Sequence, residues 1–159
     1  MKKILFVDDE SFVLSGLQRL FRKQRSQWEM SFVNGIQEAL AVLAEDRYDV
    51  VITDVDMSSI NGVKLLEWIY QESPDTARIV LTGHTGEDIA RQAVKLAHQY
   101  LSKPVDFETL KTAIDLACRG RYTIDNQRFQ SLIGSCDSLP SLPTLYMEIT
   151  RAAESSKTN

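Results

Sequence analysis

Five polar side chains spread along the chain are of types that together suit phosphoryl-transfer chemistry: Asp8, Asp9, Asp54, Thr82 and Lys103. Carboxylates crowded into a small volume repel one another unless a cation compensates them. Oxygen ligands with room for water suit Mg²⁺ better than a transition metal. A lysine ammonium and a threonine hydroxyl nearby would surround a carboxylate able to become an aspartyl phosphate. This chemistry requires residues distant in sequence to meet.

Short apolar runs rich in β-branched residues alternate along the chain with segments of helical periodicity. The first, third and fourth runs are continuously apolar, as in central parallel strands covered by helices on both faces. The pattern therefore predicts five β–α units and an α/β fold. The predicted strands are Ile4–Val7, Glu29–Val33, Val50–Thr53, Arg78–Thr82 and Gln99–Leu101.

The segments between these strands carry apolar residues at helical spacing. Thr85 and Asp88 form a capping-box pair that predicts the start of the fourth helix. In an open parallel sheet, ligands bind at the carboxyl ends of the strands, where the five polar residues lie. We therefore expect one shared crevice. The helical stripes are Val13, Leu14, Leu17, Leu20 and Phe21; Ile36, Ala39, Leu40 and Leu43; Leu65, Leu66 and Ile69; Ile89, Ala90, Ala93 and Val94; and Phe107, Leu110, Ile114, Ala117 and Cys118.

Each polar residue taken singly has a simpler explanation. Asp9 and Glu10 could favour the positively polarised start of the next helix. Asp54 could form a turn, Thr82 could cap a strand end, and Lys103 could be a solvated charge before a rigid turn. Their coincidence at the strand ends of one sheet favours a shared site instead.

Composition restricts the classes of function. The 159 residues, 43% of them hydrophobic, suit one domain with an appendage. A net charge of -4 gives no general attraction to nucleic acid or to an anionic membrane, so we expect neither as a partner. The first apolar run ends at carboxylates too early for an export signal, which predicts a cytoplasmic protein. Two cysteines without a C-x-x-C pair predict no zinc or redox site.

The stretches "FVDDE", "VVITDVDMSSINGVKLL", "RIVLTGH" and "YLSKPVDFETL" occur in this order. In this order and spacing they resemble a response-regulator receiver domain of two-component signalling over residues 1–119. The resemblance implies a flavodoxin-like (βα)5 doubly wound parallel sheet with strand order 2-1-3-4-5, followed by a C-terminal helical extension. It implies a signalling switch with self-phosphorylation and slow autodephosphorylation, not a metabolic enzyme.

The resemblance also assigns roles to the acidic residues. Asp54 would accept a phosphoryl group from a phosphohistidine on a sensor histidine kinase or a phosphotransfer protein. Asp8, Asp9, Asp54 and the backbone carbonyl of Asp56 would hold Mg²⁺, the cofactor that the family implies.

The remaining roles concern the switch. Thr82 and Lys103 would bind the phosphoryl oxygens, and Tyr100 would rotate inward when Thr82 moves. A cis peptide bond between Lys103 and Pro104 would hold the lysine toward the site. We expect the face from Glu87 to Arg119 to contact an attached output domain or a second receiver in a homodimer.

The C-terminal part is expected to contain a partly helical linker over residues 120–143 and the helical start of an output domain over 144–159. The stretch "LIGSCDSLPSLPTLYMEITRAAES" resembles the opening of an HDOD domain. A short helix that packs back on the receiver is the alternative.

Three other functions compete with this interpretation. "VVITDVDMS" also resembles the nucleophile motif of haloacid dehalogenase-type phosphatases, but their acidic metal ligands follow the lysine, whereas Asp8 and Asp9 precede it. A flavin-binding protein would need a phosphate loop where three carboxylates stand. A receiver-like module that binds partners without phosphorylation is the third alternative, and the complete set of acceptor residues argues against it.

Overall fold

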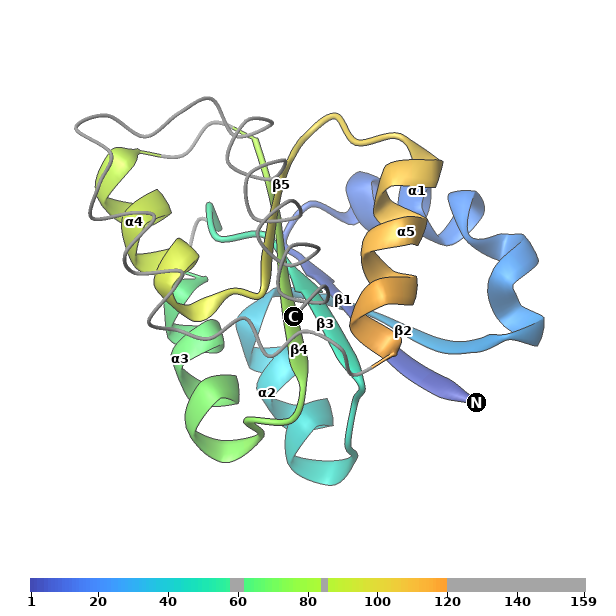
Figure 1. Cartoon of the computed structure of the whole chain (residues 1–159), viewed down its shortest axis with the longest axis horizontal. Coiled ribbons are helices and arrows are strands. Elements are labelled where there is room, and N and C mark those ends of the chain that lie inside the picture. Colours follow the sequence, from blue (N-terminus) through green and yellow to red (C-terminus); the bar gives the residue numbers. More distant parts are fainter. Residues whose placement is uncertain (58–61, 84–85, 120–159) are drawn as a thin grey trace, which may run out of the picture.

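The computed structural model describes residues 1–57, 62–83 and 86–119, and these form a five-stranded parallel sheet with helices on both faces (Figure 1). The strand order is β2-β1-β3-β4-β5, with every neighbouring pair parallel. The predicted fold class is therefore confirmed. The strands are β1 (Lys2–Asp8), β2 (Trp28–Asn34), β3 (Val50–Thr53), β4 (Ala77–Thr82) and β5 (Gln99–Ser102). The helices are α1 (Ser11–Leu20), η1 (Arg22–Ser26, 3₁₀), α2 (Gly35–Glu45), α3 (Val63–Glu72), α4 (Glu87–Leu96) and α5 (Phe107–Cys118).

The apolar run of β1 supplies both faces of the sheet. Ile4 and Phe6 pack in a cluster with residues of α1 and α5, whereas Leu5 and Val7 pack with residues of α2 and α3. All four side chains are buried. Figure 1 shows α1 and α5 on one side of the sheet and α2, α3 and α4 on the other. A continuously apolar strand thus results from helices that cover both faces.

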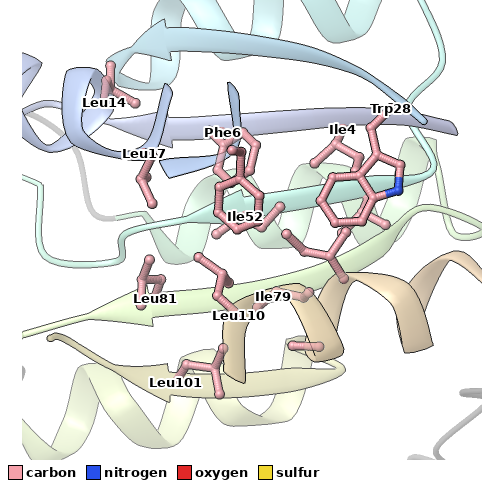
Figure 2. Packing of buried hydrophobic residues seen from close by; sticks show 14 residues of the cluster. Ile4, Phe6, Leu14, Leu17, Trp28, Ile52, Ile79, Leu81, Leu101 and Leu110 are labelled. Carbon is pink, nitrogen blue, oxygen red and sulfur yellow. The ribbon is translucent and has the colours of Figure 1, made fainter. Parts of the chain in front are cut away.

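The cluster between the sheet, α1 and α5 holds most of the aromatic packing (Figure 2). The ring of Phe6 stacks on that of Phe32 with centroids 4.8 Å apart. Phe21 packs against Phe6, Trp28 and Phe107 at centroid distances of 5.6, 5.8 and 5.2 Å. Burying these large side chains fixes α1 and α5 against the sheet, and with them the loops at the carboxyl ends of β1 and β5.

The end of α1 differs from the predicted stripe. Leu20, expected on the apolar side, is 42% exposed, whereas Phe21 is fully buried. The chain leaves the helix at Phe21, its C-cap residue, and turns into η1. Because Phe21 fills the space among three aromatic rings, the neighbouring Leu20 is left outside.

The start of α4 also differs from the prediction. The N-cap residue is Gly86, which has no side chain to make a cap. Thr85 lies outside the described residues, as do the second cysteine, Cys136, the predicted linker at 120–143 and the predicted helical start at 144–159. Within the described part of the chain, no helix is long and apolar enough to cross a membrane.

Candidate functional site

The loop after β1, here called the acidic loop (residues 8–11), brings three carboxylates together. One oxygen from each of Asp8, Asp9 and Glu10 lies within 4.8 Å of the others. Asp8 is buried, and its Oδ1 accepts a hydrogen bond from the backbone N–H of Glu10 at 2.9 Å. Glu10 is the N-cap residue of α1 but makes no side-chain cap hydrogen bond. Helix capping therefore does not account for the carboxylate of Glu10.

Asp54 follows β3 and is almost fully buried, with 4% of its surface exposed. Its Oδ1 accepts hydrogen bonds from the Thr82 hydroxyl at 2.7 Å and from the backbone N–H of Asp56 at 2.8 Å. The Thr53 hydroxyl donates to the backbone carbonyl of Asp54 at 2.9 Å. These contacts fix the carboxylate and direct its other oxygen, Oδ2, toward a different partner.

That partner is Lys103, from the segment after β5. Its Nζ donates to Oδ2 of Asp8 at 2.6 Å and to Oδ2 of Asp54 at 2.9 Å. Burial alone would lower the pKa of Lys103, but the hydrogen bonds to Asp8 and Asp54 outweigh burial and raise it above its ordinary value. The ammonium therefore stays charged and compensates two buried carboxylates at once.

The position of Lys103 is set by its backbone. Its N–H donates to the carbonyl of Thr82 at 2.8 Å, and the peptide bond between Lys103 and Pro104 is cis, as the resemblance implied. Tyr100, on β5, is 1% exposed and packs in a cluster with residues of α3 and α4. The Thr82 hydroxyl and the Tyr100 ring thus both occupy inward positions. The switching role of Tyr100 stays a prediction.

The structure therefore brings the predicted residues Asp8, Asp54, Thr82 and Lys103 into direct contact, and Asp9 lies beside Asp8. The donor set around the acidic loop consists of carboxylate oxygens, which fit a hard cation such as Mg²⁺. Lys103 occupies only one oxygen of Asp8 and one of Asp54. A divalent cation would share these carboxylates with the lysine.

Two residues near the site, Glu10 and Asn34, were not predicted as part of it. Glu10 belongs to the carboxylate cluster but was not among the predicted metal ligands. The side-chain amide of Asn34, at the end of β2, donates to the Asp9 carbonyl at 3.2 Å and to the Ser11 hydroxyl at 3.0 Å. The Asn-Gly pair at residues 34–35 was the available signal, since it marks a turn at the carboxyl edge of the sheet.

Among curated proteins, the chain is 40% identical over 112 residues to the two-component response regulator ARR10 of Arabidopsis thaliana, a match that covers 69% of this chain and 20% of that protein. It is 31% identical over 121 residues to the response regulator protein PilR of Pseudomonas aeruginosa, covering 76% of this chain and 27% of the relative. The chain thus spans about a fifth to a quarter of these two relatives.

Solved structures of response regulators also match this chain, and the matches cover nearly their whole length. A response regulator receiver domain protein from Clostridium thermocellum is 36% identical with a TM-score of 0.68, and the match covers 75% of this chain and 95% of that one. The response regulator protein TrrA of Thermotoga maritima, in complex with Mg²⁺-BeF, is 28% identical with a TM-score of 0.64, covering 74% and 99%. The sequence model of the response regulator receiver domain matches residues 4–115. The chain belongs to the response regulator receiver domain family.

Proposed function

We propose that the described domain is a phosphorylation-dependent switch in which Asp54 accepts a phosphoryl group from a phosphohistidine. The observation that carries the proposal is the threefold engagement of Asp54, whose two oxygens contact Thr82, Lys103 and the backbone of Asp56. A carboxylate that is buried and oriented by fixed donors is prepared for nucleophilic attack.

The geometry favours Oδ2 of Asp54 as the attacking oxygen. Oδ1 already accepts two hydrogen bonds, from Thr82 and from Asp56. Attack by Oδ2 forms a P–O bond while the P–N bond of the phosphohistidine breaks. If the other ring nitrogen of the phosphohistidine carries a proton, the imidazole leaves as the neutral ring. Lys103 follows the negative charge from the carboxylate to a phosphoryl oxygen, and the Thr82 hydroxyl turns from Oδ1 toward another.

Asp8, Asp9, Asp54 and the backbone carbonyl of Asp56 are the residues proposed to hold Mg²⁺, and the carboxylate of Glu10 lies beside those of Asp8 and Asp9. When bound, the ion would supply positive charge that offsets the carboxylates and the phosphoryl oxygens. The protein's own contribution is to keep Asp8 beside Asp9 and to link Asp8 to Asp54 through Lys103.

The partners follow from the same proposal. A sensor histidine kinase or a phosphotransfer protein would supply the phosphoryl group, and an attached output domain would receive the signal. The NtrC4 receiver domain, 32% identical with a TM-score of 0.67 over 75% of this chain and 98% of that one, is described as a beryllofluoride-activated dimer. A second receiver copy on the α4–β5–α5 face is therefore our proposal for the active state.

Intact mass after incubation with acetyl phosphate and Mg²⁺ tests the proposal. We expect the mass of one phosphoryl group to be added to the wild type and to be absent from Asp54→Asn. Asp75→Asn is the matched control, because it makes the same change at an exposed carboxylate outside the site. An adduct that persists in Asp54→Asn would contradict the assignment of the acceptor. No adduct in the wild type, even with a cognate kinase, would favour a module that acts by binding alone.

A further inference from the structure

Asn34 connects the edge strand β2 to the acidic loop. It pairs with Asp8 in the parallel register of β1 and β2. Its side-chain amide donates hydrogen bonds to the Asp9 carbonyl at 3.2 Å and to the Ser11 hydroxyl at 3.0 Å. Both acceptors belong to the acidic loop, one within the carboxylate cluster and one at the first residue of α1. A single side chain thus bridges the middle and the end of this loop.

Asn34 stands at a helix N-cap position, but its side chain does not cap the helix. Asparagine is favoured at helix N-caps because its side-chain oxygen accepts a hydrogen bond from the first helical turn. Asn34 is the N-cap residue of α2 but makes no side-chain cap hydrogen bond. Its backbone N–H instead donates to Glu38 at 2.8 Å, and Gly35 makes the turn into α2 at a φ of 83°. The backbone of Asn34 is held from the α2 side, and its amide is directed to the acidic loop.

We propose that Asn34 is a positioning residue for the Mg²⁺ site, an inference that rests on the function proposed above. By holding the Asp9 carbonyl and the Ser11 hydroxyl, it keeps the carboxylate of Asp9 beside those of Asp8 and Glu10. The three carboxylates repel one another, so a loop without this restraint would relax outward. Outer contacts that orient metal ligands change metal affinity because the ligands need not be ordered on binding.

Titration of the full chain with MgCl₂ by isothermal calorimetry tests this inference, since it measures binding without any phosphoryl transfer. Asn34→Ser keeps an N-cap-competent residue that is too short to reach the acidic loop. We expect its Mg²⁺ dissociation constant to rise about tenfold. Ser11→Ala should raise it less, because the bond from Asn34 to the Asp9 carbonyl remains. Gln37→Ser also replaces a side-chain amide by a hydroxyl, at an exposed position of α2, and should leave the dissociation constant unchanged.

A second measurement separates positioning from a general loss of structure. In phosphorylation by acetyl phosphate, Asn34→Ser should need more Mg²⁺ for half-maximal rate, while its rate at saturating Mg²⁺ equals that of the wild type. Thermal unfolding in EDTA should give similar midpoints for Asn34→Ser and Gln37→Ser.

The outcomes are distinct. If the wild type binds Mg²⁺ and Asn34→Ser binds it equally well, the positioning role is wrong and the proposed function stands. If the wild type binds no Mg²⁺, both the proposed function and the positioning role of Asn34 are wrong. If Asn34→Ser is unfolded in EDTA, Ser11→Ala decides, and an unchanged affinity in that variant overturns the inference.

Discussion

The protein should lose stability between neutral and mildly acidic pH because of one partly buried histidine. The Nδ1 atom of His98 accepts a hydrogen bond from the backbone N–H of Arg78 at 3.0 Å, so this nitrogen must be unprotonated. Burial, and then the nearby positive charge of Arg78, lower the pKa of His98 from 6.5 to about 4. Arg78 is itself buried at the start of β4 and donates to the carbonyl of Leu96 at 2.7 Å.

The sign and size follow from proton linkage. Between a pH of about 6.5 and about 4, the unfolded chain binds a proton at His98 that the folded protein does not. The free energy of unfolding therefore decreases as pH falls through this window. Above the window His98 is neutral in both states, and this loss of stability is absent. For these two pKa values, the free energy of unfolding at about pH 5 should be ~2 kcal/mol lower than at neutral pH.

Urea unfolding of the wild type and of His98→Asn at both pH values isolates this contribution. The asparagine Oδ1 can accept the hydrogen bond from Arg78 but does not titrate. Acidic groups elsewhere affect both proteins alike, so they cancel in the comparison. With a urea slope of about 2 kcal/mol per M, the wild-type midpoint should fall by an additional ~1 M on acidification. Equal losses in the two proteins, or a folded-state His98 titration near 6.5 by NMR, would refute the reasoning.

Two further predictions concern the site and its support. Lys103→Met should lower the thermal midpoint in EDTA, because the buried carboxylates of Asp8 and Asp54 lose the ammonium that pairs with both, a cost of about 3–5 kcal/mol. Mg²⁺ should restore part of this stability. An unchanged midpoint in EDTA would argue against the pairing. Gly62→Ala should destabilise the fold by about 1–3 kcal/mol in chemical unfolding, because the new Cβ would lie 2.4 Å from the backbone oxygen of Asp54. Gly16→Ala is its control: it meets nothing within 4 Å in the middle of α1 and should stabilise by about 0.5–1 kcal/mol.

The sheet and the positions of the site residues could be predicted from the sequence for a simple physical reason. A central parallel strand is buried on both faces, so it must be apolar throughout, and polar residues appear only where it emerges. Asp8 and Asp54 stand at such points, and Thr82 is the last residue of β4. The contacts among them then follow from the parallel arrangement, which aligns the carboxyl ends of all strands at one edge.

The partners of individual side chains were not predictable in the same way. Asn34 suits both a helix cap and a tertiary contact, and only the three-dimensional register with Asp8 decides between them. Lys103 was expected to bind phosphoryl oxygens, and its pairing with the carboxylates of Asp8 and Asp54 was not expected. Leu20 has the right helical spacing for the core, but the burial of Phe21 determines which of the two lies inside. Periodicity describes one element at a time, whereas these outcomes depend on competition between elements.

The bridge made by Lys103 has a consequence for the order in which the chain folds. Its partner Asp8 lies 95 residues earlier in the sequence, and Asp54 lies 49 residues earlier. β1, β2 and β3 can pair as soon as the first half of the chain has been synthesised, but the two buried carboxylates then have no ammonium to offset them. The arrival of the segment after β5 removes this electrostatic penalty. The acidic residues that prepare the site for chemistry therefore also make the first half of the sheet depend on the last strand, which favours all-or-none folding of the domain.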